Sequence, residues 1–214
     1  MSPSASLGPR LNAIYDLLSN AQKHNFYTRI WDCCCDHGYL GIKILHENLC
    51  DKLIFVDQVA HIMQQLEAKL SPFKYEKYEL ITGDAAELNF DPDISHLVIL
   101  AGVGGERTVQ ILSAIENNNP DIELDYIFCP STSQGALREY LVSEKYALLQ
   151  ETLVYENKRY YEVLYVRTAF ADTELPSVSL SCELWDTNDA KQKKYLQKLE
   201  KHENKKRKQS GNTD

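Results

Sequence analysis

The sequence has 214 residues and a mass of 24.5 kDa, with 43% hydrophobic and 25% charged residues, the composition of an ordinary globular protein. No apolar run approaches the ~20 residues needed to cross a bilayer, and the start, MSPSASLGPR, lacks the basic and apolar regions of a signal peptide. We therefore expect a cytoplasmic protein without a membrane partner, with its six cysteines present as free thiols.

The elements predicted along the chain begin with a helix over residues 9–21, where apolar residues recur at helical spacing. Five short apolar runs suited to buried strands follow: TRIWDCC (28–34), KLIFVD (52–57), YELITGD (78–84), HLVILAG (96–102) and DYIFCP (125–130). Helical stretches follow four of these runs: GYLGIKILHEN (38–48), VAHIMQQLEAKL (59–70), GERTVQILSAIEN (105–117) and SQGALREYLVSEKY (133–146). This alternation predicts a parallel sheet covered by helices on both faces.

The rhythm changes after residue 146. Two strand-like runs, ALLQETLVYE (147–156) and YYEVLYVRT (160–168), are separated by only Asn157, Lys158 and Arg159. A connection that short joins only antiparallel strands. The outline is typical of an α/β, Rossmann-like class I methyltransferase fold, with a mostly parallel seven-stranded sheet and a terminal antiparallel hairpin.

The chain divides into three parts by composition. Residues 1–168 form the predicted methyltransferase domain, residues 169–189 are an irregular connection, and residues 190–214 are a basic tail that can form a helix. The tail segment Lys191–Lys208 carries a net +7, whereas residues 1–189 carry a net −14. The tail is either a solvated end of the chain or an arm that contacts a polyanion such as RNA.

Carboxylates and glycines stand at the ends of four consecutive predicted strands. Asp32, Asp57 and Asp84 end the first three, and AGVGG (101–105) ends the fourth. Asp57 follows Gly38 by 19 residues, close to the spacing expected of the acidic residue that binds a ribose. One such carboxylate often only caps the next helix, but together they predict a nucleotide-type cofactor site at the carboxyl edge of the sheet.

Several motifs resemble those of the bacterial tRNA (adenine-N1)-methyltransferases that act on position 22 of tRNA. The first motif of that family, D-x-G-S-D-H-[AG]-Y-L, is similar to DCCCDHGYL (32–40), and its A-G-M-G-G is similar to AGVGG. Its Q-P-N, A-L-R-x-[WY]-L and Y-E segments resemble CPS (129–131), ALREYL (136–141) and YYEVLYV (160–166), and its Arg-Leu opening resembles Arg10-Leu11. The resemblance covers residues 8–168.

The resemblance implies S-adenosylmethionine as cofactor, tRNA as partner, and methylation of adenine N1. The cofactor-binding residues that it implies are Asp32, Cys34, Gly38, Asp57, Gln58, Asp84, Ala85, Ala101 and Gly102. Asp36, His37, Gly104 and Ser131 are the candidates for positioning the reacting groups. Two alternatives remain: a catalytically weak methyltransferase-fold protein that binds S-adenosylmethionine or RNA, and a methyltransferase that acts on small molecules.

The three consecutive cysteines raise the question of a metal or redox site. Adjacent cysteines chelate one ion poorly, so no metal is predicted. Cys34 stands where the family has Gly, Cys35 where it has Ser, and Ser131 where it has Asn. We therefore interpret Cys34 and Cys35 as small-residue substitutes in a cofactor loop.

Overall fold

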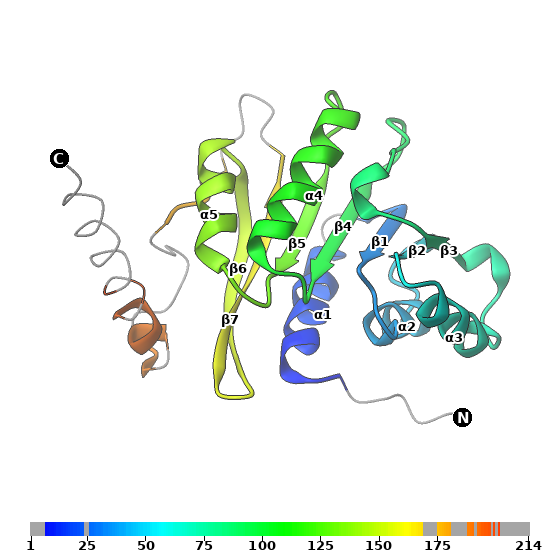
Figure 1. Ribbon diagram of the computed structural model, residues 1–214, viewed down its shortest axis with the longest axis horizontal. Helices are drawn as coiled ribbons and strands as arrows, with labels where there is room; N and C mark the ends of the chain where they lie inside the picture. The colour runs from blue at the N-terminus through cyan, green and yellow to red at the C-terminus, as the bar shows by residue number, and fades with distance from the viewer. Residues whose placement is uncertain are drawn as a thin grey trace.

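The computed structural model describes residues 7–23, 26–168, 175–180, 188–190, 192–197, 199 and 201. Its centre is a seven-stranded sheet with strand order β3-β2-β1-β4-β5-β7-β6 (Figure 1). The strands are β1 (Arg29–Cys33), β2 (Lys52–Asp57), β3 (Tyr78–Thr82), β4 (His96–Ala101), β5 (Asp125–Cys129), β6 (Ala147–Glu156) and β7 (Arg159–Arg167). The first five pair in parallel, and β7 is antiparallel to both β5 and β6. The predicted fold class is confirmed.

Helices cover both faces of this sheet. They are α1 (Pro9–Ala21), α2 (Tyr39–His46), α3 (Ala60–Leu70), α4 (Gly105–Asn118) and α5 (Gln134–Ser143). Successive strand residues point to opposite faces, so Ile30 and Phe55 pack with α1, α2 and α3. Trp31 and Val56, one residue further along each strand, pack with α4 and α5, the helices in front of the sheet in Figure 1. Burial on both sides explains why these strands are almost continuously apolar.

The β6–β7 hairpin is tighter than the sequence suggested. Its turn consists of Asn157 and Lys158, both with positive φ (49° and 62°), and Arg159 is already the first residue of β7. Positive φ at both turn residues is the geometry that suits a two-residue hairpin loop. Because β6 runs parallel to β5, this turn lies at the same edge of the sheet as the carboxyl ends of β1–β5.

Parts of the expected connection and tail pack on the hairpin. Ser177 forms an antiparallel bridge with Ala147 at the start of β6. Ala190 and residues 192–197, 199 and 201 are helical, and Tyr195 of this segment is buried against Leu153 and Tyr160. Residues 169–174, 181–187 and 202–214, with Lys191, Lys198 and Glu200, lie outside the described residues. In the described part of the chain, every helix is too short or too polar to cross a membrane.

Candidate functional site

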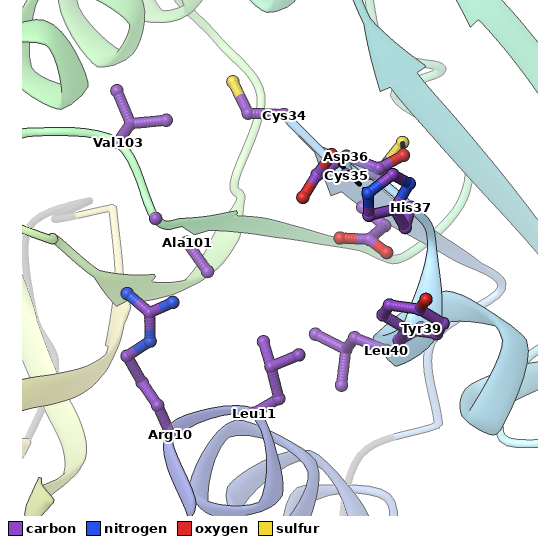
Figure 2. A pocket seen from close by; sticks show the side chains of 12 residues that line it. Arg10, Leu11, Cys34, Cys35, Asp36, His37, Tyr39, Leu40, Ala101 and Val103 are labelled. Carbon is purple, nitrogen blue, oxygen red and sulfur yellow. Dashed lines mark hydrogen bonds and ion pairs between the residues drawn. The ribbon is translucent and has the colours of Figure 1, made fainter. Parts of the chain in front are cut away.

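Two adjoining cavities lie at the carboxyl ends of β1–β4, where the strand order reverses between β1 and β4. Such a switch point is where open α/β sheets bind their ligands. The first cavity, about 380 Å³, is lined by Arg10, Leu11, Asp32, Cys34, Cys35, Asp36, His37, Tyr39, Leu40, Ala101, Gly102 and Val103 (Figure 2). The second, about 190 Å³, is lined by Cys34, Val56, Asp57, Gln58, Val59, Gly83, Asp84, Ala85, Val103, Arg107 and Ile111. Cys34 and Val103 belong to both linings, so the two cavities share a wall.

The loop after β1 forms this shared wall through an unusual backbone conformation. Cys34, Asp36 and Gly38 all have positive φ, at 57°, 49° and 68°. The Cys34 amide donates to the carbonyl oxygen of Val56 at 2.7 Å, which fixes the loop to β2. The left-handed region favours glycine, which agrees with the interpretation that Cys34 occupies a glycine position. Gly38 lies outside both linings, and a Cβ there would come within 2.4 Å of the Leu66 side chain.

Asp57 connects this loop to the second cavity. Its Oδ2 accepts a hydrogen bond from the Asp36 amide at 3.1 Å, and its Oδ1 accepts one from the Val59 amide at 3.0 Å. A carboxylate has about four acceptor sites, so Asp57 keeps capacity for two ligand hydroxyls. Gln58, also predicted, lies beside it in the same lining.

Two hydrogen-bond donors fix the orientation of the Asp84 carboxylate in the second cavity. Its Oδ1 accepts from the Ala86 amide at 3.0 Å, and Oδ2 accepts from Nη2 of Arg107 at 2.9 Å. The Ala86 amide and the Arg107 guanidinium lower the pKa of Asp84. Arg107 was not anticipated, because its place beside the third strand depends on how α4 packs on the sheet.

Asp32 is a buried residue whose carboxyl lies in the lining of the first cavity. Its side chain accepts from the Gly41 amide at 3.1 Å, and the residue is only 5% exposed. Desolvation, with the negative charge of Asp57 adding to it, raises the pKa of Asp32 to about 7. Gly41 allows this contact because a Cβ there would lie 2.2 Å from the Phe55 ring and 2.9 Å from Asp32.

Arg10 supplies the positive charge of the first cavity. Figure 2 shows its guanidinium reaching from α1 toward Ala101 and Val103. It lies 5.0 Å from the centre of the Tyr161 ring, its Nε is 3.6 Å from Oε2 of Glu156, and that Nε makes no hydrogen bond with a described residue. The sequence placed Arg10 in a motif but indicated no role for it, since only the packing of α1 brings it to the cavity.

Of the four residues expected to position the reacting groups, two line the first cavity. Asp36 and His37 stand at the rim of the first cavity, with 3.8 Å between Oδ1 and Nε2. Gly104 and Ser131 lie outside the linings of both cavities. The Ser131 amide instead donates to the carbonyl oxygen of Val103 at 2.8 Å, so the loop after β5 supports the cavity wall.

The three consecutive cysteines are protonated thiols, because burial raises their pKa values. Cys33 is buried beneath α4 and α5, whereas Cys34 faces the two cavities. Burial, with the charges of Asp57 and Asp84 adding to it, raises the pKa of Cys34 to about 11, and burial also raises the pKa of Cys35. Neither is a thiolate at neutral pH. Among the described residues, no three His, Cys, Asp or Glu side chains gather as metal ligands.

This sheet order, the antiparallel β7 and the acidic strand ends around a divided cavity define a class I methyltransferase-type domain. The family model described as "Methyltransferase domain" matches residues 7–164, and the chain belongs to that family.

Individual relatives agree with this assignment. The chain is 28% identical over 169 residues to the Mycoplasma pneumoniae protein named "Putative tRNA methyltransferase", covering 77% of this chain and 73% of that one. M. capricolum TrmK, solved with S-adenosyl-homocysteine, has a TM-score of 0.67 at 20% identity, covering 92% of this chain and 97% of that one. The B. subtilis M1A22 tRNA methyltransferase TrmK has a TM-score of 0.61 at 20% identity, covering 77% of this chain and 67% of that one.

Proposed function

We propose that the protein is a cytoplasmic, S-adenosylmethionine-dependent methyltransferase that methylates N1 of a tRNA adenine, at position 22. The observation that carries this proposal is the pair of adjoining cavities at the switch point, one with two carboxylates at strand ends and one with a cation and a buried carboxyl. The tRNA methyltransferases with a similar fold or sequence support the choice of substrate.

The two cavities suit the two halves of the cofactor. Asp57 and Asp84 offer acceptors for ribose hydroxyls and an adenine amino group in the second cavity. In the first cavity, Arg10 can bind the carboxylate of the methionyl half, and Asp32 can bind the positively charged groups of the same half. Cys34 and Val103 then line the junction of the two halves.

The chain's own contribution to the reaction is mainly positioning. When bound, S-adenosylmethionine supplies an electrophilic methyl group on a sulfonium, and adenine N1 can attack it without first losing a proton. The methylated adenine is a cation, so carbonyl oxygens and carboxylates at the site stabilise the developing charge. Asp36 is the exposed carboxylate in the lining of the first cavity and is suited to that task. An adenine inside folded tRNA must leave its stack to reach this cavity.

The test is incubation of the protein with labelled S-adenosylmethionine and a tRNA transcript that has adenine at position 22. We expect N1-methyladenosine in the nucleoside digest, and none from the same transcript with guanine at position 22. Cofactor binding without any N1-methyladenosine would replace this proposal with the binding-protein alternative. Methylation of both transcripts would overturn the assignment of position 22.

A further inference from the structure

A third cavity, of about 700 Å³, lies between the loop after β5, the tip of the β6–β7 hairpin and the C-terminal helical segment. It is lined by Ser131, Thr132, Gln134, Tyr155, Lys158, Arg159, Tyr160, Lys194, Gln197 and Lys201. Four of these are cations, and this lining contains no carboxylate. On a chain whose first 189 residues carry a net −14, such a lining is a local reversal of charge.

The four cations are available to a ligand. Lys158 and Arg159 are exposed at the hairpin tip, and Lys194 and Lys201 are exposed on the C-terminal segment. None of them forms an ion pair with another described residue. Lys194 and Lys201 are seven positions apart, which places them on the same side of a helix. Two pairs of cations from distant parts of the sequence therefore face one cavity.

Two tyrosines, Tyr155 and Tyr160, lie beside these charges in the same lining. Tyr155 is 48% exposed, and its ring centre lies 4.9 Å from that of Tyr160. The ring of Tyr160 also contacts that of Tyr195, with 5.3 Å between ring centres. An exposed aromatic ring flanked by cations is the arrangement on which an unpaired nucleic-acid base stacks while its phosphates are held.

The C-terminal segment is anchored well enough to keep its lysines in place. The hydroxyl oxygen of Tyr195, a buried residue, lies 2.9 Å from both Oε1 of Gln134 and Oε1 of Glu162. Gln134 in turn donates to the carbonyl oxygen of Tyr160 at 2.9 Å and accepts from the Glu162 amide at 3.0 Å. The helical segment, the start of α5 and β7 are thus held together by one hydrogen-bond network.

The third cavity adjoins the candidate methyl-transfer site. Ser131 lines the third cavity, and its amide donates to the carbonyl oxygen of Val103. Val103 is part of the linings of both the first and the second cavity. The third cavity and the candidate methyl-transfer site are therefore neighbours, joined by this backbone hydrogen bond.

We propose that the third cavity binds a nucleotide of the substrate RNA that flanks the target adenine. Lys158, Arg159, Lys194 and Lys201 hold its phosphates, and Tyr155 stacks its base. This inference rests on the proposed function, because it takes the RNA substrate from there. It adds a defined subsite on the hairpin tip, so the described lysines of the tail act together with β6 and β7.

The test compares Lys158→Ala/Arg159→Ala, Lys194→Ala/Lys201→Ala and Tyr155→Ala with the wild type. Lys74→Ala/Lys145→Ala is the control, because it removes two exposed lysines from loops at the opposite edge of the sheet. Removing one cation that holds a phosphate should reduce the salt slope of tRNA binding by about 0.7 to 0.9. Tyr155→Ala should raise KM for tRNA on the order of tenfold with kcat little changed, and Tyr155→Phe should restore it. The affinity for S-adenosylmethionine should be unchanged in all variants.

The outcomes separate this inference from the proposed function. A wild type that binds tRNA without methylating it overturns the function, and the variants still test the subsite through binding alone. A wild type that binds no RNA overturns both. Salt slopes equal to that of the control variant, or a Tyr155→Ala variant with wild-type KM and affinity, overturn the subsite only. Polyglutamate that displaces a bound RNA oligonucleotide as effectively as unlabelled RNA would likewise overturn it, in favour of a general anion surface.

Discussion

The carboxylate of Asp57, at the end of β2, accepts a hydrogen bond from the backbone amide of Asp36, with 3.1 Å between Oδ2 and the amide nitrogen. This bond ties the second cavity to the loop that walls the first. Asp57 therefore contributes to ligand binding in two ways. It offers its own acceptor sites, and it keeps the loop after β1 in place.

Replacing Asp57 with Ala should weaken S-adenosylmethionine binding strongly. The loss of a charged acceptor costs roughly 1.5–3 kcal/mol, on the order of tenfold to a hundredfold in affinity. Asp57→Asn should be milder, because one oxygen remains to accept a backbone amide. Titration calorimetry measures both, with Asp121→Ala, an exposed carboxylate at the opposite edge of the sheet, as control. An Asp57→Ala variant with wild-type affinity would show that the site is misplaced.

Replacing Cys34 with Gly should keep or improve cofactor binding. The residue has φ of 57°, which costs a side-chain-bearing residue roughly 1–2 kcal/mol, and its side chain narrows the junction of the two cavities. Glycine removes both effects. Its greater conformational entropy in the unfolded state offsets part of the gain in the free energy of unfolding. Cys34→Val, with a branched Cβ, should lower both stability and affinity. Thermal unfolding measures the stability of the Cys34→Gly and Cys34→Val variants, and titration calorimetry measures their affinity for the cofactor. Equal stability and equal affinity of the two variants would contradict this prediction.

The sequence predicted the strand-end carboxylates because strand periodicity and strand ends are local features. Asp57 and Asp84 line the second cavity, as expected for a parallel sheet whose carboxyl ends share one edge. Arg10 and Arg107 received no role, because α1 and α4 bring them to the site only through tertiary packing. For the tail, the sequence indicated a basic charge and a possible helix, whereas its anchoring through Tyr195 depends on partners in α5 and β7.

The raised pKa of Asp32 predicts a dependence of stability on pH. Its native pKa, about 7, exceeds the unfolded value of about 3.9. Between pH 4 and 7 the unfolded state has therefore lost a proton that the native state keeps, so this residue's contribution falls as pH rises, by up to about 1.4 kcal/mol per unit. Asp32→Asn keeps an acceptor for Gly41 and removes the titration. Urea unfolding from pH 5 to 8 should show the free energy of unfolding of the wild type falling, relative to that of this variant, as pH rises to 7. If the free energies of unfolding of the two proteins change with pH in parallel, burial does not raise the pKa of Asp32.

Replacing Arg10 with Ala should weaken binding of the methionyl half of the cofactor and leave binding of the adenosine half unchanged. The Arg10 guanidinium reaches into the first cavity, where it suits a carboxylate, whereas the second cavity holds the acceptors for ribose and adenine. Loss of a charge-assisted hydrogen bond should weaken S-adenosylhomocysteine binding by roughly 1.5–3 kcal/mol.

The matched ligand for this variant is 5′-methylthioadenosine, which has the adenosine and thioether but no carboxylate. Its affinity should be unchanged in Arg10→Ala and reduced in Asp57→Ala. Glu156→Gln is the control variant, because it removes the carboxylate 3.6 Å from Arg10 and should leave or strengthen binding of both ligands. If Arg10→Ala weakens the two ligands equally, Arg10 supports the shape of the cavity through Tyr161 and does not bind the methionyl carboxylate.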